Sequence, residues 1–305
     1  SLSSQDIWNP EESMKIKSIS QTDISNDGKY VAYVVREAIM KDKKSEFLSQ
    51  IWVYNTGGSQ SIQYTFNQKS STSPKFSPDG KKIAFLSSRS GKNQIWIMNT
   101  LGGEAKKLTD EKKGVRSIKW SPDGNNISFL KNDNDTEEET KSKENKTDVI
   151  LVDKNFKYSH IYSYDFTKDS VIQITKGNFS VNNFDYSPKG GKMIFSHQDD
   201  TNINTGFINT DISLIESDGS NMKNIISRPG LDSNPIFSRD GNKFAFISSG
   251  GKQESIGLRD VYIYDFKNKS TIKLHDTPNR DSNIISWSSD NKMVIISENV
   301  NTTSQ

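Results

Sequence analysis

Short apolar runs separated by polar turns recur along the entire chain. Residues 83–86 (Ile-Ala-Phe-Leu) and 95–98 (Ile-Trp-Ile-Met) are two such runs, and Ser, Asn, Asp, Gly and Lys surround them. Runs of this length, bounded by turn-forming residues, are typical of β-strands that are buried on both faces. The pattern therefore predicts an all-β fold made of many short strands.

A turn motif marks the period of an internal repeat. The sequence Ser-Pro-Asp-Gly begins at Ser77 and again at Ser121, and each copy leads into an apolar run that ends in Phe-Leu. Weaker copies begin at Ser25, Ser187, Ser238 and Ser288. Successive copies are 52, 44, 66, 51 and 50 residues apart. Because periods of about 40–50 residues with strand-like content are typical of β-propeller blades, we expect a propeller with about six blades in this chain.

Each repeat is predicted to contain four antiparallel strands joined by tight turns. In one unit the strands are expected at residues 73–77, 82–87, 94–99 and 105–109. Within its first turn, Pro78 presets φ, Asp79 can bond its own backbone, and Gly80 accepts a positive φ. Equivalent third strands are expected at residues 51–54, 160–164, 211–215 and 260–264, and outer strands at 171–175, 223–226 and 271–274.

A four-stranded sheet that stands alone cannot bury both of its faces, and this constrains how the repeats assemble. Packing the sheets face to face around an axis buries these faces and leaves only short edges. The aromatic residues of the repeats therefore have a structural role in this interpretation. Inter-blade packing is expected of Trp52, Trp96, Trp120 and Trp287.

Two segments depart from the repeat. Residues 131–148 account for the longest interval, are highly charged and contain no apolar residue, which predicts a solvated loop insertion. The sixth unit has expected strands at 284–288 and 293–298, but we expect no third or outer strand in residues 299–305. Residues 6–12 are expected to form a capped turn of helix rather than a strand. We therefore expect one propeller over residues 1–305 that is incomplete at its C-terminus, in a chain that is a fragment.

Composition and charge exclude several classes of function. Hydrophobic residues make up 31% and aromatic residues 10% of the 305 residues, and disordered chains are poorer in aromatics. The net charge of +2, from 40 basic and 38 acidic residues, gives no electrostatic case for nucleic acid. No run approaches 18 apolar residues, so no membrane span is predicted. Cys is absent, which excludes disulfides and thiolate sites, and a soluble protein of the cytoplasm or the periplasm fits equally.

Motifs for catalysis and for cofactor binding are missing from the sequence. There is no G-x-S-x-G nucleophile elbow and no glycine-rich phosphate loop, and the Gly-Ser pairs at Ser59 and Ser220 are interpreted as hairpin turns. The three histidines, His160, His197 and His275, are not at metal-ligand spacing. We therefore expect no catalytic residue, no cofactor and no metal site in this chain.

Two predicted loops carry the candidates for substrate gating or binding. Residues 196–200 follow the second strand of a blade, which places His197, Asp199 and Asp200 on a connecting loop at one rim. Arg89 lies on the equivalent loop two repeats earlier, where its guanidinium can bind a carboxylate or a carbonyl. Binding groups are common on loops that a rigid scaffold positions. The alternative interpretation is structural: a polar turn, and an arginine that is solvated or salt-bridged.

Several segments resemble a known family. The repeat at residues 77–85 (Ser-Pro-Asp-Gly-Lys-Lys-Ile-Ala-Phe) and the third strand at 94–98 (Gln-Ile-Trp-Ile-Met) resemble TolB-type, WD40-like propellers. They equally resemble the N-terminal propellers of the prolyl oligopeptidase family of serine peptidases. Residues 8–11 (Trp-Asn-Pro-Glu) and the segment 152–162 after the charged insertion are similar to the acylaminoacyl-peptidase-like members of that family.

The resemblance implies a propeller, often with seven blades, over a C-terminal α/β-hydrolase domain that carries a Ser-Asp-His triad. That triad and that domain are outside this chain, so no catalytic residue is carried over. The chain is then the non-catalytic, substrate-gating part of a serine exopeptidase or oligopeptidase, inactive alone, whose partner is a peptide substrate. A homo-oligomer is left open.

Two other hypotheses remain open. One is a stand-alone TolB-like propeller that acts as a scaffold for protein–protein contacts. The other is a complete enzyme with a non-standard site on the rim. A reading frame that continues into a hydrolase with G-x-S-x-G distinguishes the peptidase hypothesis from both.

Overall fold

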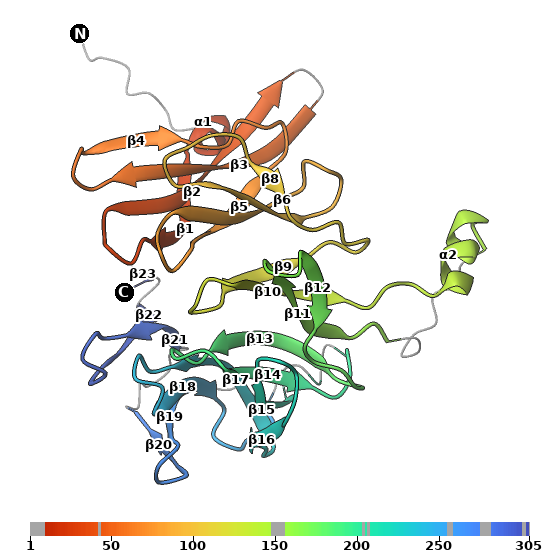
Figure 1. Ribbon diagram of the computed structural model, residues 1–305. Coiled ribbons are helices and arrows are strands. Elements are labelled where there is room, and N and C mark those ends of the chain that lie inside the picture. The colour runs from red at the N-terminus through yellow and green to blue at the C-terminus, as the bar shows by residue number, and fades with distance from the viewer. Residues whose placement is uncertain are drawn as a thin grey trace. The chain divides into compact units, whose positions relative to one another are not determined.

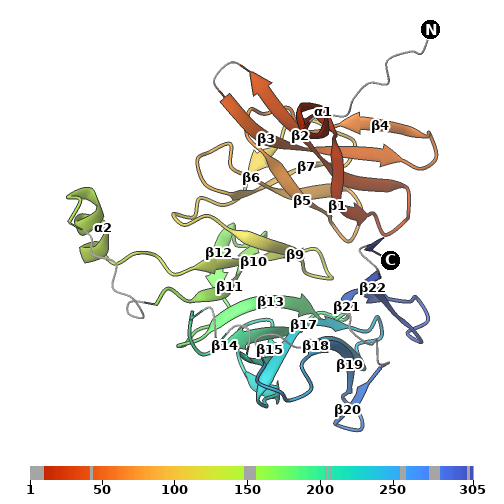
Figure 2. The same cartoon turned by 180° about the vertical axis from the view of Figure 1, so that it is seen from behind.

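The computed structural model describes residues 10–41, 44–147, 156–202, 205, 208–254, 259–274, 282–300 and 303–304. The chain divides into two compact units, Ser1–Trp120 and Ser121–Gln305, and each is described by itself. Both consist almost entirely of antiparallel strands (Figures 1 and 2). The prediction of an all-β fold is confirmed.

The first unit contains two four-stranded sheets. The strand order is β1 (Ser18–Ile24), β2 (Tyr30–Lys41), β3 (Lys44–Asn55) and β4 (Gln60–Gln63) in one, and β5 (Ser71–Phe76), β6 (Lys82–Ser87), β7 (Gln94–Asn99) and β8 (Lys106–Lys107) in the other. Helix α1 (Pro10–Lys15) precedes the first sheet and strand β9 (Arg116–Trp120) follows the second. Neighbouring strands are consecutive in the chain and antiparallel, so each sheet is a meander.

The second unit repeats the same meander. Its strands are β10 (Asn126–Asn132), β11 (Ser159–Asp165) and β12 (Ser170–Gln173); β13 (Ser180–Tyr186), β14 (Lys192–Gln198), β15 (Asn209–Glu216) and β16 (Lys223–Ile226); β17 (Gly230–Phe237), β18 (Lys243–Ser248), β19 (Asp260–Asp265) and β20 (Ser270–Lys273); and β21 (Ser282–Trp287), β22 (Val294–Val300) and β23 (Thr303–Ser304). A short parallel pairing of β15 with β17 joins two successive sheets. The sheet β21–β23 has three strands. Antiparallel sheets of four strands, which recur with the turn motif in the rest of the chain, are the blades of a β-propeller.

Two strands of the repeat at residues 73–109 lie where the apolar runs predict them. β6 and β7 occupy residues 82–87 and 94–99 as expected, whereas β8 is shorter than the expected 105–109. Helix α1 begins at Pro10, so the expected turn of helix is confirmed for the described part of residues 6–12. The number of blades in an intact domain stays a prediction.

The Ser-x-Asp-Gly turn is held by a side-chain hydrogen bond. In five copies the Ser hydroxyl donates to the carboxylate two residues later at 2.5–2.7 Å, in the pairs Ser25–Asp27, Ser77–Asp79, Ser121–Asp123, Ser238–Asp240 and Ser288–Asp290. This bond is the largest cause of the lowered pKa of each of these carboxyls. The fourth copy has Lys189 in place of Asp, and there Ser187 Oγ donates to the carbonyl oxygen of Gly190. These aspartates are turn-formers, as the sequence predicts.

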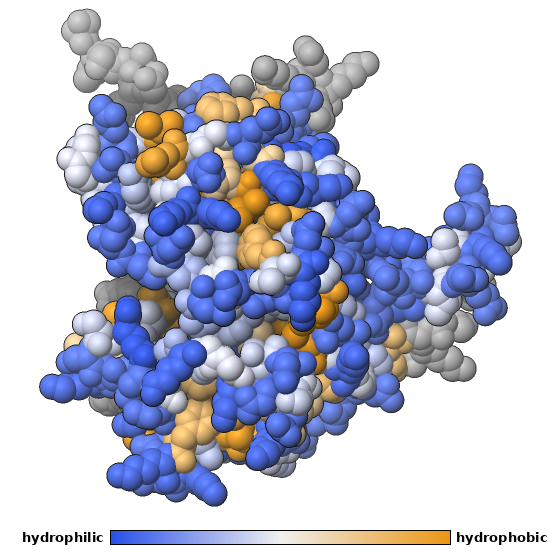
Figure 3. Space-filling model, viewed as in Figure 1, coloured by the Kyte–Doolittle hydropathy of each residue, from blue (hydrophilic) through white to orange (hydrophobic). Residues whose placement is uncertain are grey.

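Successive sheets bury their faces against each other within each unit. In the first unit, Ala32 and Ile51 of one sheet share a core cluster with Ile83 and Phe85 of the next. All residues of β6 after Lys82 are buried, as expected for a strand that is covered on both faces. The visible surface is mostly hydrophilic (Figure 3), because the apolar side chains are concentrated between the sheets.

Polar bonds also connect neighbouring sheets. The Asp23 carboxylate accepts a hydrogen bond from Phe76 N at 2.8 Å, and Asp185 accepts one from Phe237 N at 2.9 Å in the second unit. Two tryptophans make equivalent bonds at 3.0 Å, in which Trp120 Nε1 donates to Lys75 O and Trp287 Nε1 donates to Ile236 O. Trp287 also belongs to the core cluster of its sheets. The expected packing role is supported for Trp120, for Trp287 and for Trp96, which packs against the core cluster of the first unit. Trp52 is half-buried on β3.

The charged insertion at residues 131–148 is not only a loop, so that expectation is wrong in part. Lys131 and Asn132 belong to β10, and helix α2 (Glu137–Glu144) follows. The reason is a capping box: Glu139 N donates to Thr136 Oγ1 at 3.2 Å, and Thr136 N donates to the Glu139 carboxylate at 2.7 Å. Helix α2 has no buried residue and projects from its unit (Figures 1 and 2).

The expectation that the last sheet has no third strand is also wrong. β23 pairs with β22 through Asn299 with Ser304 and Val300 with Thr303. The residues that form β23 are polar, and therefore they carry no apolar pattern from which a strand can be predicted.

The two tryptophans that make the same interstrand bond differ in burial, and this predicts different costs of truncation. Trp287 is 4% exposed, so Trp287→Ala should destabilise by about 3–5 kcal/mol. Trp120 is only half-buried, so Trp120→Ala should cost about 2–3 kcal/mol. Trp120→Phe keeps most of the packing and should cost about 1 kcal/mol for the lost bond. Urea unfolding of the three variants checks the order, and an equal cost for both alanine variants would contradict it.

Candidate functional site

Arg89 lies on the turn between β6 and β7, at the end of the sheet where the second strand leaves and the third begins (the 2–3 end). Its guanidinium lies over the Trp96 ring, 4.6 Å from the centroid. Nε donates to Ser87 Oγ and Nη2 donates to Ser71 Oγ, both at 3.1 Å. The side chain is half-buried, and burial lowers the pKa of Arg89. The structure places Arg89 on a loop as the sequence predicts, and its role stays a prediction.

A second arginine, which sequence reasoning missed, occupies the 2–3 end of the sheet β17–β20. Arg228 Nη2 donates to Ser248 Oγ at 2.7 Å, and the guanidinium lies 5.2 Å from the Tyr262 centroid. Nη2 and Nε also donate to the two carboxylate oxygens of Asp232, at 3.0 and 3.2 Å. Asp232 is fully buried. Burial raises the pKa of Asp232, and the bonds from Arg228 and Ser248 oppose that shift.

His197 is not on a loop, so that expectation is wrong. It belongs to β14 and is 4% exposed. The imidazole packs against Phe179 and Phe195, with centroids 5.1 and 5.4 Å away, and its Nε2 lies 2.8 Å from Ser213 Oγ. Burial lowers the pKa of His197, opposed by the charges of Asp211 and Asp199. The strand extends to Gln198 because β15 pairs with it as far as His197, and Ser180 of β13 pairs with Gln198.

The contact between His197 and Ser213 is not a nucleophile–base pair. Ser213 Oγ donates to Asn224 Oδ1 at 2.7 Å, so it must accept the hydrogen bond from His197 Nε2–H. His197 Nδ1 then carries no proton, and among the described residues it has no hydrogen-bond partner. A catalytic triad needs a carboxylate at this nitrogen and an accessible hydroxyl, whereas Ser213 is fully buried. The third hypothesis, an enzyme with a site on the rim, gains no support from these two residues.

Asp199 and Asp200 lie on the loop after β14. Asp199 is exposed, whereas Asp200 is half-buried and holds its own loop. The Asp200 carboxylate accepts hydrogen bonds from Asn202 N at 2.9 Å and from Thr205 Oγ1 at 3.1 Å. Of the two, Asp199 therefore has the carboxylate that is more open to a ligand.

Titratable side chains connect the 2–3 ends of two successive sheets in the second unit. The Asp211 charge acts on both groups: it opposes the lowering of the His197 pKa by burial, and it adds to the raising of the Asp232 pKa by burial. Thr210 Oγ1 accepts from Asp232 N at 2.9 Å and donates to Asp232 O at 3.0 Å, which fixes the two strands to each other. The structure thus places Asp211 opposite His197 in the register of β14 and β15, and the adjacent Thr210 against Asp232, an arrangement that no short sequence motif marks.

His160 has a structural role that the repeats explain. Its Nδ1 lies 3.3 Å from Thr175 Oγ1, which accepts a bond from Ile161 N at 2.9 Å. Gln94 in the first unit bonds Thr109 in the same way, at 2.8 Å. His160 is thus a buried strand residue that takes the place of a glutamine, and burial lowers its pKa. His275 lies outside the described residues.

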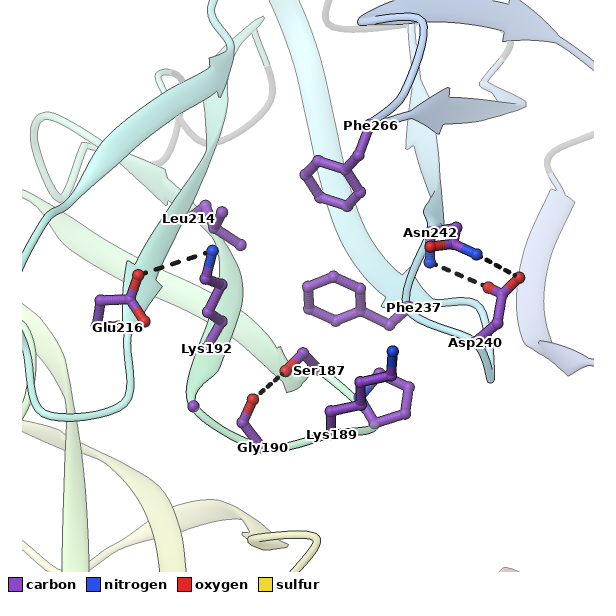
Figure 4. Close-up of a pocket in the computed structure, with 13 residues that line it drawn as sticks. Ser187, Lys189, Gly190, Lys192, Leu214, Glu216, Phe237, Asp240, Asn242 and Phe266 are labelled. Carbon is purple, nitrogen blue, oxygen red and sulfur yellow. Dashed lines mark hydrogen bonds and ion pairs between the residues drawn. The ribbon is translucent and has the colours of Figure 1, made fainter.

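One pocket of the second unit is a crevice between two successive sheets. It has a volume of about 410 Å³, and Leu214, Phe237 and Phe266 form its apolar wall (Figure 4). A second crevice of about 240 Å³, which includes Tyr186 and Asp123, occurs at the same ends of the preceding sheets. Because the crevice recurs with the repeat, sheet packing explains it, and it adds no chemistry to the candidate site.

The structure offers no metal centre among the residues it describes, since none of their His, Asp and Glu side chains form a group of three or more. Neither described helix has the length and apolar character that a membrane crossing requires.

The fold is that of a β-propeller, and comparison with known proteins agrees. A family model described as the Tricorn protease N-terminal beta propeller domain matches residues 47–145. The uncharacterized peptidase YuxL of Bacillus subtilis (strain 168) is 37% identical over 76 residues, which are 25% of this chain and 11% of YuxL.

Solved structures share the fold over most of the chain. Acylaminoacyl peptidase of Pyrococcus horikoshii matches with a TM-score of 0.71 and 22% identity, over 96% of this chain and 44% of that one. TolB of Acinetobacter baumannii matches with a TM-score of 0.56 and 19% identity, over 86% of this chain and 55% of that one. The chain thus spans less than half the length of this peptidase and a small part of YuxL. Its fold is similar to that of acylaminoacyl peptidase and of TolB, and parts of its sequence are similar to the Tricorn N-terminal propeller model and to YuxL.

Replacing Arg228 of the Arg228–Asp232 pair should lower the free energy of unfolding substantially. Arg228→Ala leaves a fully buried carboxylate without its partner, which typically destabilises by about 3–5 kcal/mol. The matched control is Lys243→Ala in the same sheet. Lys243 lies 3.9 Å from Asp265 and is 44% exposed, so its loss should cost less than about 1 kcal/mol. Urea unfolding compares the two variants, and similar costs would mean that the buried pair has no special role.

His197 should make the protein less stable in mild acid. Burial lowers its pKa below the ordinary 6.5, so the unfolded chain binds a proton that the folded chain refuses. The contribution of neutral His197 to the free energy of unfolding is therefore complete above pH 6.5. It is lost as the pH falls below that value, at up to about 1.4 kcal/mol per pH unit. His197→Phe should flatten this dependence in urea melts between about pH 7.5 and 5.5. An unchanged slope would show that His197 does not titrate in this way.

Proposed function

We propose that this chain is the non-catalytic propeller of a serine peptidase of the acylaminoacyl- or dipeptidyl-peptidase type, and that it limits access to peptides. The observation that carries the proposal is the match to an acylaminoacyl peptidase over 96% of the chain. The similarity to the peptidase YuxL supports the same class. In this proposal a hydrolase domain outside these residues supplies the nucleophile, its base and the orienting carboxylate.

The properties of the sheets suit a wall that excludes folded proteins. Their second strands are buried, and side-chain bonds such as Asp185 to Phe237 N connect successive sheets. A stack of this kind resists opening, because separating two sheets exposes apolar area and leaves polar groups unpaired.

Arg89 and Asp199 are the proposed substrate contacts, each considered by itself. The guanidinium of Arg89 is half-buried with hydroxyl partners, and the Asp199 carboxylate is exposed. In the proposal His197 and Asp200 act indirectly. His197 supports β14 from within, and Asp200 holds the loop that carries Asp199.

The alternative, a stand-alone TolB-like scaffold, has the same fold but less support. The TolB match has the lower TM-score, 0.56 against 0.71, and covers less of this chain. We therefore retain the peptidase proposal alone.

The test compares the complete gene product with this chain. The complete protein should cleave acetylated and free aminoacyl chromogenic substrates and short peptides, and it should leave the same peptide sequence uncut within a folded protein. This chain alone should cleave none of them, because its residues include no nucleophile elbow. A reading frame without a hydrolase domain, or turnover by the purified chain alone, would contradict the proposal.

A further inference from the structure

In two sheets of this protein an arginine has equivalent neighbours, but only one of these sheets gives its arginine a carboxylate partner. In each, the guanidinium bonds a buried serine at the end of the second strand and lies near an aromatic ring of the third strand. The shared positions are Ser87, Phe85 and Trp96 around Arg89, and Ser248, Phe246 and Tyr262 around Arg228.

The register of the strands identifies the missing carboxylate. Asp232 pairs with Ser248 in the sheet of Arg228, and Ser71 pairs with Ser87 in the sheet of Arg89. Ser71 therefore occupies the position of Asp232, and its hydroxyl accepts from Arg89 Nη2 where the carboxylate would. Among the residues that the structure describes, none gives Arg89 a carboxylate partner.

Asn67 marks where a carboxylate would bind. With its amide oxygen turned to the guanidinium, Asn67 accepts from Nη2 at 2.9 Å and from Nη1 at 3.1 Å. One neutral oxygen thus faces the two donors that a carboxylate engages with two oxygens. Beneath the guanidinium, Trp96 Nε1 is buried and has no acceptor among the described residues. The guanidinium of Arg89 is thus surrounded by hydroxyl and amide groups, and no carboxylate of the described residues bonds it.

We propose that Arg89 binds a carboxylate of a peptide, which displaces the Asn67 amide from Nη1 and Nη2. The inference rests on the proposed function, because that function makes peptides the ligands. The Arg228–Asp232 pair shows within the same molecule that an arginine in such surroundings binds a carboxylate through two nitrogens, Nε and Nη2 in that case. A half-buried guanidinium strengthens such a bond, because water screens the charges less than at an open surface.

The experiment measures peptide binding to this chain, without any peptidase assay. The probes are acetyl-Ala-Phe with a free carboxylate, its C-terminal amide, and acetyl-Glu-Phe amide, whose only carboxylate is in a side chain. Calorimetry gives the affinities, and the NMR signal of Arg89 Nε–H reports whether the guanidinium is contacted. The free acid should bind and shift this signal, and the Ala-Phe amide should bind about 10-fold more weakly or worse. The Glu peptide reveals whether a side-chain carboxylate can substitute for the terminal one.

Asn67→Asp is the decisive variant, because it is nearly isosteric and supplies a carboxylate from within. It should weaken binding of the free acid by about 10-fold or more. Asn99→Asp adds the same charge at the opposite end of β7, where Asn99 pairs with Lys82, and should leave the affinity within about twofold. Ser71→Asp, which copies the Asp232 position, should also weaken binding, and thermal melts of both variants confirm that they fold.

The inference is overturned if acid and amide bind equally, if neither carboxylate peptide shifts Arg89 Nε–H at about 10 mM, or if Asn67→Asp binds like the unaltered chain. These results are independent of the proposed function. If the chain binds the free acid but the complete protein has no hydrolase domain, the inference about Arg89 holds and the proposed peptidase function is refuted. If the complete protein is an active peptidase but Arg89 does not bind carboxylates, the proposed function holds and the inference is refuted.

Discussion

The structure depends on one constraint: the second strands β6, β10, β14 and β18 are buried on both sides and need a neighbour on both. The buried run of β6 illustrates this, since residues Ile83 and Ala84 point to opposite faces and both are fully buried. A sheet built on such a strand gains stability only when further sheets cover it. Repetition is therefore a requirement of the sequence, and the turns, tryptophans and aspartates that join one sheet to the next are its consequences.

The same repeat also explains how one arrangement of residues around an arginine can serve either stability or binding. At Arg228 the buried carboxylate of Asp232 binds the guanidinium and neutralises its charge. At Arg89 a serine stands in the position of that aspartate, and the charge stays uncompensated among the described residues. Equivalent positions in different repeats of one protein can thus be compared with each other. A residue that differs in one repeat shows what the other repeats need at that position for stability. Binding groups can arise by removing a partner rather than by adding a residue.

Sequence reasoning predicted most strands and less of the site. β6 and β7 could be predicted because apolar runs and Pro-Asp-Gly turns are local signals. The place of His197 could not, because its strand is extended by contacts with Phe179 and Ser213, which are distant in the sequence. Helix α2 could have been predicted from the Thr136-x-x-Glu139 capping box, but its high charge suggested a loop. Arg228 and Asp232 are four residues apart, yet their sequence alone does not reveal that the carboxylate is buried.

The shortness of the last strand in each sheet has a consequence for colloidal behaviour. β8 has two residues, both lysines, and β4, β12, β16 and β20 have four residues each. A free edge of this length offers few backbone groups to a foreign strand, and lysine side chains repel a second copy of the same edge. A polypeptide with so many sheets would otherwise be prone to fibrous self-association. Short last strands, with lysines in β8, β16 and β20, allow it to contain much β-structure without offering long edges to a second copy.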